Sequence, residues 1–383
     1  MQCLKKKWAS QKISPELTAI KKELTKKSRP TIHENQLNAT EYDLIEYIHS
    51  ETKKGNVNNV TRTNAYLDFY KKHPEIHWAF LGHMVSRNGG WNMTDLKGSL
   101  LSRVLSQEEQ EEFFRFLERG NWLIFQDIYP QLLLYGESIK RNTSLFYLLP
   151  LFHVSYFMRV IWNYFYQNKD RYLLTIALII NEQSYLEKRV IQNPYYQSTV
   201  LQTLEFKLQE LLDLNQIIFP ALDGKEIKII GQTIHQFASL HDRILLGKRL
   251  YQLLYDTENY LSIYKWAIQH PHTGSRKDFW PHVFNDIDEY VPWGSYQRRI
   301  KDCRIKPNAP KLYSPILKYA WNNTEQKEAE KEDWYSDWKV IHYFKKDMSK
   351  GNGAIYHEYC KTLEKIELSI LAKEALLPKK SKN

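Results

Sequence analysis

Apolar side chains recur every three to four residues along most of the chain, and polar capping residues bound the segments in which they recur. Asn38 with Glu41 has the spacing of a capping box ahead of an apolar helical stripe, and Gly55 is a typical helix end. Ser106 with Glu109 repeats the signal further along. The pattern predicts a succession of helices starting at 14 and at 92, and over 38–55, 59–70, 74–88, 106–120, 170–192, 197–214, 233–255 and 354–376.

One segment has a strand-like pattern: between Ile217 and Ile230, Asp223-Gly224 would form the turn of a hairpin, although the segment can equally be a loop. The chain holds only 14 Gly and 14 Pro, which disfavours a turn-dense β-sandwich or barrel. Its 26 Tyr, 16 Phe and 11 Trp offer large surfaces for burial. We therefore predict an all-α protein, a large multi-helix globular bundle with an aromatic-rich core and at most one short hairpin near 217–230.

The least charged stretch, residues 142–168, carries Arg159 as its only charged residue. A helix needs about 20 mainly apolar residues to cross a bilayer. Pro150 interrupts this stretch, and Arg159 would lie near its middle, where lipid makes a charge costly. We expect a core helix here, with a membrane-contacting helix as the alternative.

The net charge of +10 resides at the two ends of the chain. Residues 1–30 carry eight Lys and one Arg against two Glu, and Lys379, Lys380 and Lys382 close the sequence, so that residues 31–378 are neutral overall. A neutral body argues against a nucleic-acid platform, although the tails could contact an anionic membrane or nucleic acid weakly. We expect a basic N-terminal tail or helix at 1–37, a helical core domain at 38–321, and a charged linker with a C-terminal amphipathic helix and basic tail at 322–383.

The three cysteines, Cys3, Cys303 and Cys360, are too few and too widely spaced for a disulfide framework or a zinc knuckle. No disulfide partner is expected, and a reducing compartment, the cytoplasm, is the simplest location. The lysine-rich N-terminus is not followed by an apolar stretch, so we expect no secretory signal.

The most informative segment is residues 74–95, whose middle carries no fixed charge. A helix that is apolar on all sides is a buried helix, yet this one contains His77, His83 and Arg87. His83 and Arg87 are four residues apart and share a face, whereas His77 lies on another. Buried polar side chains must find partners, and for Arg87 the partner is an internal acid or an anionic ligand. The candidate internal acids are Asp95 and Glu137.

Further polar groups flank this helix. Arg62 lies in a short polar run at a predicted helix N-terminus, where unpaired backbone amides favour an anion. Asn88 lies at the end of the helix, on the face of His77. After the helix, Gly89-Gly90-Trp91-Asn92 would form a sharp turn that presents an aromatic ring and an amide. His272 and Arg276 lie in a loop that could close over a ligand or simply cap the next helix.

The leading hypothesis is that the protein binds, and could hydrolyse, a small anionic ligand. Arg62 and Arg87 would hold the anion, and His83 would be the general acid or base. The other residues expected to line the site are His77, Asn88, Trp91, Asn92, His272 and Arg276. Any one of them could instead be a packing residue that is satisfied inside the core. No phosphate loop, dinucleotide fingerprint or nucleophile elbow occurs, so the cofactor, if any, stays unknown.

Two other functions remain open. The first is a non-enzymatic interaction or scaffold protein whose basic tails contact a membrane or nucleic acid. The second is a metal-dependent phosphohydrolase, because the adjacent pair His241 and Asp242 lies in a predicted helix, as the metal ligands of such enzymes do. Those enzymes need a further His and Asp, which the sequence does not fix, and a surface His beside an acid explains the pair more simply.

Three long stretches carry a family resemblance: TRTNAYLDFYKKHPEIHWAFLGHMVSRNGGWNMTDLKG at 61–98, IGQTIHQFASLHDRILLGKRLY at 230–251 and HPHTGSRKDFWPHVF at 270–284. Through them, and over roughly residues 40–320, the chain resembles the YppC-like family of bacterial proteins, domain of unknown function 2515. The resemblance implies a cytoplasmic protein of spore-forming, Gram-positive-type bacteria. It implies no activity and assigns no catalytic residue.

Overall fold

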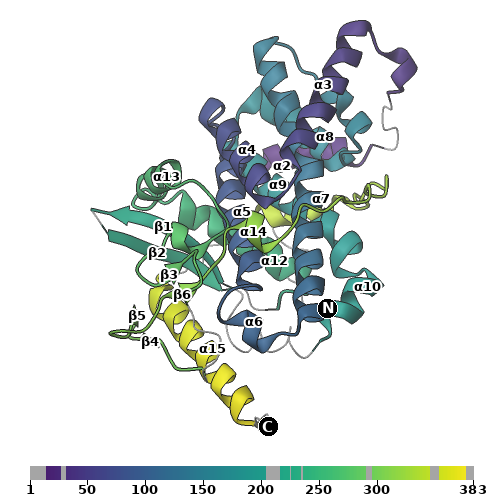
Figure 1. Ribbon diagram of the computed structural model, residues 1–383. Coiled ribbons are helices and arrows are strands. Elements are labelled where there is room, and N and C mark those ends of the chain that lie inside the picture. Colours follow the sequence, from purple (N-terminus) through teal and green to yellow (C-terminus); the bar gives the residue numbers. More distant parts are fainter. Residues whose placement is uncertain are drawn as a thin grey trace, which may run out of the picture.

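The computed structural model describes residues 14–26, 32–203, 216–224, 226–233, 236–289, 296–345 and 353–376. Within these residues the protein is mostly helical, and three two-stranded sheets complete it. Figure 1 shows the helices of the first half stacked into an elongated bundle. The hairpin of β1 (Gln216–Asp223) and β2 (Glu226–Thr233) and the long helix α15 (Tyr356–Leu376) lie to one side of it.

Four helices form the centre of the bundle: α4 (Asn59–Lys72), α5 (His77–Asp95), α7 (Gln107–Lys140) and α9 (Arg171–Leu186). α5 contacts the other three, and also α12 (Leu240–Leu254) and β1. Most side chains of α5 are buried, as its lack of fixed charge predicts. α3 (Ala39–Gly55) packs on α4 and α7, and its Asn38–Glu41 capping box is formed as expected.

Two glycine signals do not end helices. α5 continues through Gly89-Gly90 to Asp95, and α7 continues through Gly120 to Lys140, so the predicted helix ends at these glycines are wrong. A Cβ on Gly90 would overlap the side chains of Asn59 and His272, so glycine is needed there for close packing. A Cβ on Gly120 would meet nothing within 4 Å, because it points into open space.

The weakly charged stretch 142–168 forms two short elements rather than one continuous helix. η2 (Phe146–Phe152) ends at His153, which has a left-handed backbone conformation, and α8 (Tyr156–Asn168) follows. Trp162 of α8 is buried and donates a hydrogen bond to Gln131 of α7 over 2.8 Å. α2 (Pro15–Leu24) packs against α8. In the parts of the chain described above, no helix combines the length and apolarity needed to cross a membrane.

The predicted hairpin is present. β1 and β2 pair antiparallel in a register that joins Ile217 to Gln232, and Gly224 in the turn has a φ of +62°. The hairpin is fixed to α5 by Asn88, whose side chain accepts from the amide of Ile218 and donates to its carbonyl, both over 2.9 Å. α12 and α13 (Tyr260–Gln269) cover the hairpin.

In the segment 276–313, the described residues 276–289 and 296–313 are largely irregular and hold two further pairs of two-residue strands. β3 (Phe284–Asn285) pairs with β6 (Leu312–Tyr313), and β4 (Ile300–Lys301) pairs with β5 (Arg304–Ile305). The helix predicted over 197–214 begins as a π-helical turn, and residues 204–215 lie outside the described ranges. The remaining elements are η1 (Glu34–Gln36), α6 (Leu101–Val104), η3 (Glu187–Ile191), α10 (Pro194–Tyr196), η4 (Gln197–Leu201), η5 (Arg276–Asp278), α14 (Leu317–Ala320) and η6 (Trp338–Phe344).

The two ends of the chain contribute to the same hydrophobic core as the central helices. Ile20 and Leu24 of α2 and Leu363 of α15 are buried in it. α15 is also held by Glu367, which is fully buried and accepts hydrogen bonds from the backbone amides of Arg299 and Ile300 and from a tyrosine hydroxyl.

The expectation that no cysteine has a disulfide partner is wrong. Cys303, in the turn between β4 and β5, is bonded to Cys360 of α15, with Cα atoms 5.3 Å apart. The two residues are 57 positions apart, so the spacing alone gave no signal of the pairing. The bond ties the irregular segment to α15.

Removing this bond is expected to lower stability. The loop-entropy estimate for a closed segment of this length is about 4 kcal/mol. We expect Cys360→Ser to lower the free energy of unfolding by roughly that amount in urea titrations without reductant, and by much less with reductant. Denatured, unreduced protein should show one reactive thiol, from Cys3; three reactive thiols would contradict the pairing.

Candidate functional site

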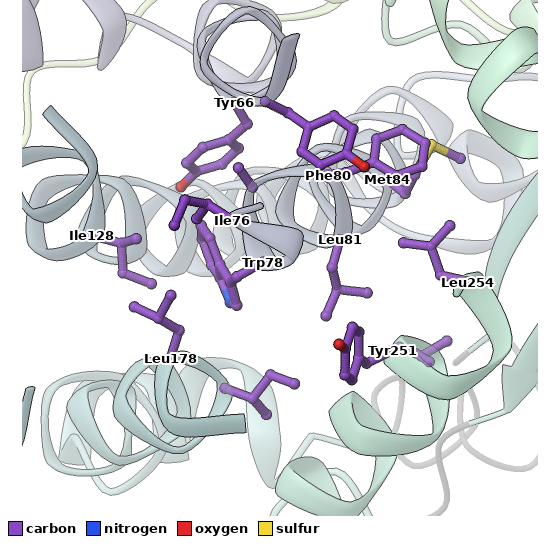
Figure 2. Close-up of a cluster of buried hydrophobic side chains, with 14 of the residues drawn as sticks. Tyr66, Ile76, Trp78, Phe80, Leu81, Met84, Ile128, Leu178, Tyr251 and Leu254 are labelled. Carbon is purple, nitrogen blue, oxygen red and sulfur yellow. The ribbon is translucent and has the colours of Figure 1, made fainter. Parts of the chain in front are cut away.

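A cavity of about 320 Å³ lies between α4, α5, α7, α9, α12 and β1. One face of α5 forms its wall, with Trp78, Val85, Gly89 and Asn92 at helical spacing. The facing stripe of α7 includes Gly120 and is otherwise mainly apolar. Figure 2 shows Trp78 and Leu81 directed from α5 toward the helices that carry Leu178 and Tyr251, whereas Phe80 and Met84 lie on the other side of α5. The cavity is therefore lined by one face of α5, and polar side chains on the other faces of this helix do not reach it.

His83 and Arg87 lie on the face of α5 that points away from the cavity. His83 is fully buried; its Nδ1 lies 2.8 Å from the carbonyl of Thr63, and its Nε2 accepts from Arg87 Nε over 3.1 Å. These partners fix the tautomer with the proton on Nδ1. Burial and the neighbouring Arg87 charge hold the pKa of His83 well below its usual value. His83 is therefore neutral, and both its ring nitrogens are engaged within the chain.

Arg87 is also satisfied largely by the protein. Its Nη2 donates to the carbonyls of Ala267 and His270, and its guanidinium lies 4.5 Å from the centre of the Trp266 ring. Burial lowers its pKa to about 10. Neither predicted acid pairs with it: Asp95 binds Arg276, and Glu137 binds Lys140 and Arg141 at the surface.

We expect Arg87→Leu to destabilise the fold. The change leaves His83 Nε2 and the carbonyls of Ala267 and His270 without this donor, at a cost of about 3 kcal/mol. Urea unfolding of the variant measures the loss. A variant with wild-type stability that has lost the ability to bind a ligand would instead show that Arg87 serves the ligand.

Three other predicted residues are likewise packed away from the cavity. His77 stacks on Tyr255 with ring centres 4.0 Å apart. Trp91 is buried against Phe279. His272 Nε2 lies 2.8 Å from Asn59 Oδ1 in the fully buried centre of the loop. None of the three lines the cavity.

The remaining predicted residues, Arg62, Asn88, Asn92 and Arg276, do line the cavity. Each arginine has an internal acid. Arg62 Nη2 is 2.5 Å from Glu118 Oε2, and Arg276 Nη2 is 2.6 Å from Asp95 Oδ2. Arg276 also donates to Asn92 and to the hydroxyl of Tyr359. The structure thus brings four of the nine predicted site residues to one cavity.

The structure gives no support to a metal site at His241 and Asp242. His241 Nδ1 is 3.4 Å from the Tyr343 hydroxyl, and Asp242 occupies the first turn of α12. Over the ranges that the structure describes, no three His, Cys, Asp or Glu side chains gather in a group able to hold a metal ion.

Comparison with known proteins places the chain in a family. The family described as "Protein of unknown function (DUF2515)" matches residues 54–360. The chain belongs to the DUF2515 family. It is 45% identical over 235 residues to a Bacillus subtilis (strain 168) protein described as "Uncharacterized protein YppC", covering 61% of this chain and 72% of the relative. No solved structure matches it significantly.

The most unusual group in the cavity of this DUF2515 chain is one that the sequence did not single out. Glu182 of α9 lines the cavity and accepts hydrogen bonds from Trp78 Nε1 over 3.1 Å and from Gln183 over 3.2 Å. Burial, with a smaller effect of the nearby Asp127 carboxylate, raises its pKa to about 8. The available signal was an acid that follows the apolar run of α9 after a single asparagine, Asn181.

This raised pKa makes stability depend on pH. The folded state binds the Glu182 proton more tightly than the unfolded state, so stability is highest below about pH 4.5 for this group and falls as pH rises toward 8. We expect wild-type DUF2515 protein to be less stable at pH 8 than at pH 5 in urea titrations. Glu182→Gln should reduce that difference by on the order of 2 kcal/mol. An unchanged difference would show that Glu182 is ionised in the fold.

Proposed function

We propose that this DUF2515 protein binds a small, predominantly apolar molecule in the cavity between α5, α7 and α9. The volume of about 320 Å³ lies at the lower end of the range for small-molecule sites. Such sites combine an apolar lining with a few placed polar groups, and this cavity does so. Trp78, Phe113, Phe116 and Phe237 supply aromatic surface, and polar groups from α4, α5, α9, α12 and β1 are placed among them.

The observation that carries the proposal is the side chain of Gln216, the first residue of β1. Gln216 lines the cavity and is only 7% exposed. In the described part of the chain neither its Oε1 nor its Nε2 has a hydrogen-bond partner, and the same is true of Arg62 Nε. A buried amide left unpaired costs about 1–3 kcal/mol, which a ligand with a donor and an acceptor would offset.

The charges in the cavity favour an apolar ligand over a strong anion. Arg62 and Arg276 are paired with Glu118 and Asp95, and the third arginine, Arg243, is paired with Glu187. An anion would have to displace one of these carboxylates. The support for the anionic ligand expected from the sequence is therefore weaker than the support for a mostly apolar one that is not an anion.

The test is calorimetric titration with 1-naphthalenemethanol, a neutral probe with an aromatic body and a hydroxyl group. We expect one saturable site per chain. Gln216→Leu, which removes the unpaired amide, should weaken binding. The absence of any saturable binding, from the alcohol or from charged analogues of the same skeleton, would contradict the proposal.

A further inference from the structure

The cavity contains one acid that has no cation. Glu182 projects from α9 into the space beside Trp78. Among the residues that the structure describes, its two oxygens accept only from the Trp78 indole and the Gln183 amide. Both donors are neutral, so neither supplies a counter-charge. Within the described ranges, no Lys, Arg or His nitrogen comes within 4 Å of its carboxylate.

The cations of the same cavity are already neutralised. Its lining, as far as the structure describes it, includes three arginines but no lysine and no histidine. Each arginine forms an ion pair with an acid other than Glu182: Arg62 with Glu118, Arg243 with Glu187, and Arg276 with Asp95. The charges that surround the cavity thus cancel pairwise, and the acid that remains is Glu182.

We propose that the ligand carries a protonated amine, which binds beside Trp78 and forms an ion pair with Glu182. This rests on the proposed function and narrows it to apolar amines. A buried charge is retained where an opposite charge pairs with it, and an ammonium group donates strongly to a carboxylate. The aromatic lining adds surface that attracts cations, through Trp78, Tyr66 and Phe237.

The groups around Glu182 determine its ionisation in the protein without ligand. Asp127 of α7 and Tyr66 of α4 face it, and its pKa of about 8 leaves it mostly protonated at pH 7. Arg62 of α4 and Arg243 of α12 carry positive charge nearby, but each is directed to its own carboxylate. On α5 the nearest group is the neutral Trp78.

Binding of an ammonium ion should therefore release a proton. In the free protein the carboxyl group holds its proton; in the complex the ammonium group stabilises the carboxylate, and the proton passes to the buffer. The ligand keeps all its own protons, so the charges balance. Affinity for the amine should then rise with pH below the pKa of Glu182, by up to about tenfold per pH unit.

The experiment uses three probes that share one skeleton: 1-naphthylmethylamine, 1-naphthalenemethanol and 1-naphthoate, which are a cation, a neutral molecule and an anion at pH 7. Each is titrated into the full chain by calorimetry in phosphate and in Tris, whose ionisation enthalpies differ. We expect the amine to bind about tenfold more tightly than the alcohol, and the naphthoate to bind most weakly. We expect about one proton to be released, with the amine alone.

Glu182→Gln should abolish both the preference for the amine and the proton release. Asp127→Asn is the matched control, because Asp127 is a buried acid of raised pKa that does not line the cavity, and it should retain the preference. An amine that binds no more tightly than the alcohol in wild-type protein would overturn the inference and leave the proposed function standing. Failure of all three probes to bind would contradict both this inference and the proposed function. The proton release is measured on wild-type protein, so the test holds even if a variant does not fold.

Discussion

Gly120→Phe should abolish binding of 1-naphthalenemethanol while the protein remains folded. Gly120 lies on the stripe of α7 that lines the cavity, and a Cβ built on it meets nothing within 4 Å. A phenylalanine ring at this position would occupy the space that the probe needs. Overlap of the two would cost several kcal/mol, so we expect affinity to fall by more than about 100-fold in calorimetric titrations.

Gly120→Ala is the matched control for this change. A methyl group leaves most of the cavity free, and alanine is about 1 kcal/mol more favourable than glycine in a helix interior. The alanine variant should therefore be more stable than wild type and should still bind the probe. If the phenylalanine variant bound the probe with wild-type affinity, the probe would bind elsewhere on the protein, and the cavity would not be its binding site.

Arg62→Met should cause the largest loss of stability among single changes near the cavity. Arg62 is 1% exposed and Glu118 is 3% exposed, so the change leaves a carboxylate buried without its cation. Breaking a buried pair from one side costs about 3–5 kcal/mol. Urea unfolding at pH 7 measures this loss. Because natural proteins are stable by only about 5–15 kcal/mol, the measurement is best made at low temperature.

The double variant Arg62→Met with Glu118→Leu separates the cost of leaving one charge unpaired from the net contribution of the ion pair to stability. Removing both charges should restore much of the lost stability, because no unpaired charge remains. Glu118→Leu alone should be destabilising, since it leaves the Arg62 charge unpaired. A loss below about 1 kcal/mol in the single variants would show that the pair is solvated and contributes little.

Local signals in the sequence were sufficient for much of the fold. The Asn38–Glu41 and Ser106–Glu109 capping boxes and the Asp223-Gly224 turn are formed as predicted, because caps and turns depend on residues within a few positions of one another. The glycine signals at Gly90 and Gly120 failed, and only for Gly90 does close packing against distant residues explain the glycine. Gly90 accommodates His272, which lies far away in the sequence.

The candidate site was predicted in part, and the helical phase of α5 explains the difference. Asn92 lies on the same face as Trp78 and reaches the cavity, whereas His83 and Arg87 lie on the other face. There His83 meets Thr63 of α4, and Arg87 meets α13 and the loop after it. Arg87 donates to a carbonyl 183 positions away, which no local pattern could reveal. Wherever the ligand binds, His83 has no free nitrogen with which to act as the predicted acid or base.

The sequence pattern did not predict Glu182 as a site residue, for a related reason. Glu182 follows an apolar helical run, where it resembles a surface residue at the end of a buried segment. Its place beside Trp78 depends on the packing of α9 against α5, and the residues are 104 positions apart. Gln216 likewise reaches the cavity only because the hairpin is fixed to α5 through Asn88.

The indole N–H resonances of Trp78 and Trp91 test the central claim most directly, because these residues lie on opposite faces of α5 and only Trp78 lines the cavity. The two signals can be assigned in ¹H–¹⁵N spectra with Trp78→Phe and Trp91→Phe. On titration with 1-naphthylmethylamine we expect a large, saturable shift of the Trp78 signal and a small shift of the Trp91 signal. A Trp78 signal that stays in place while the probe binds would show that the cavity beside Glu182 is not the binding site.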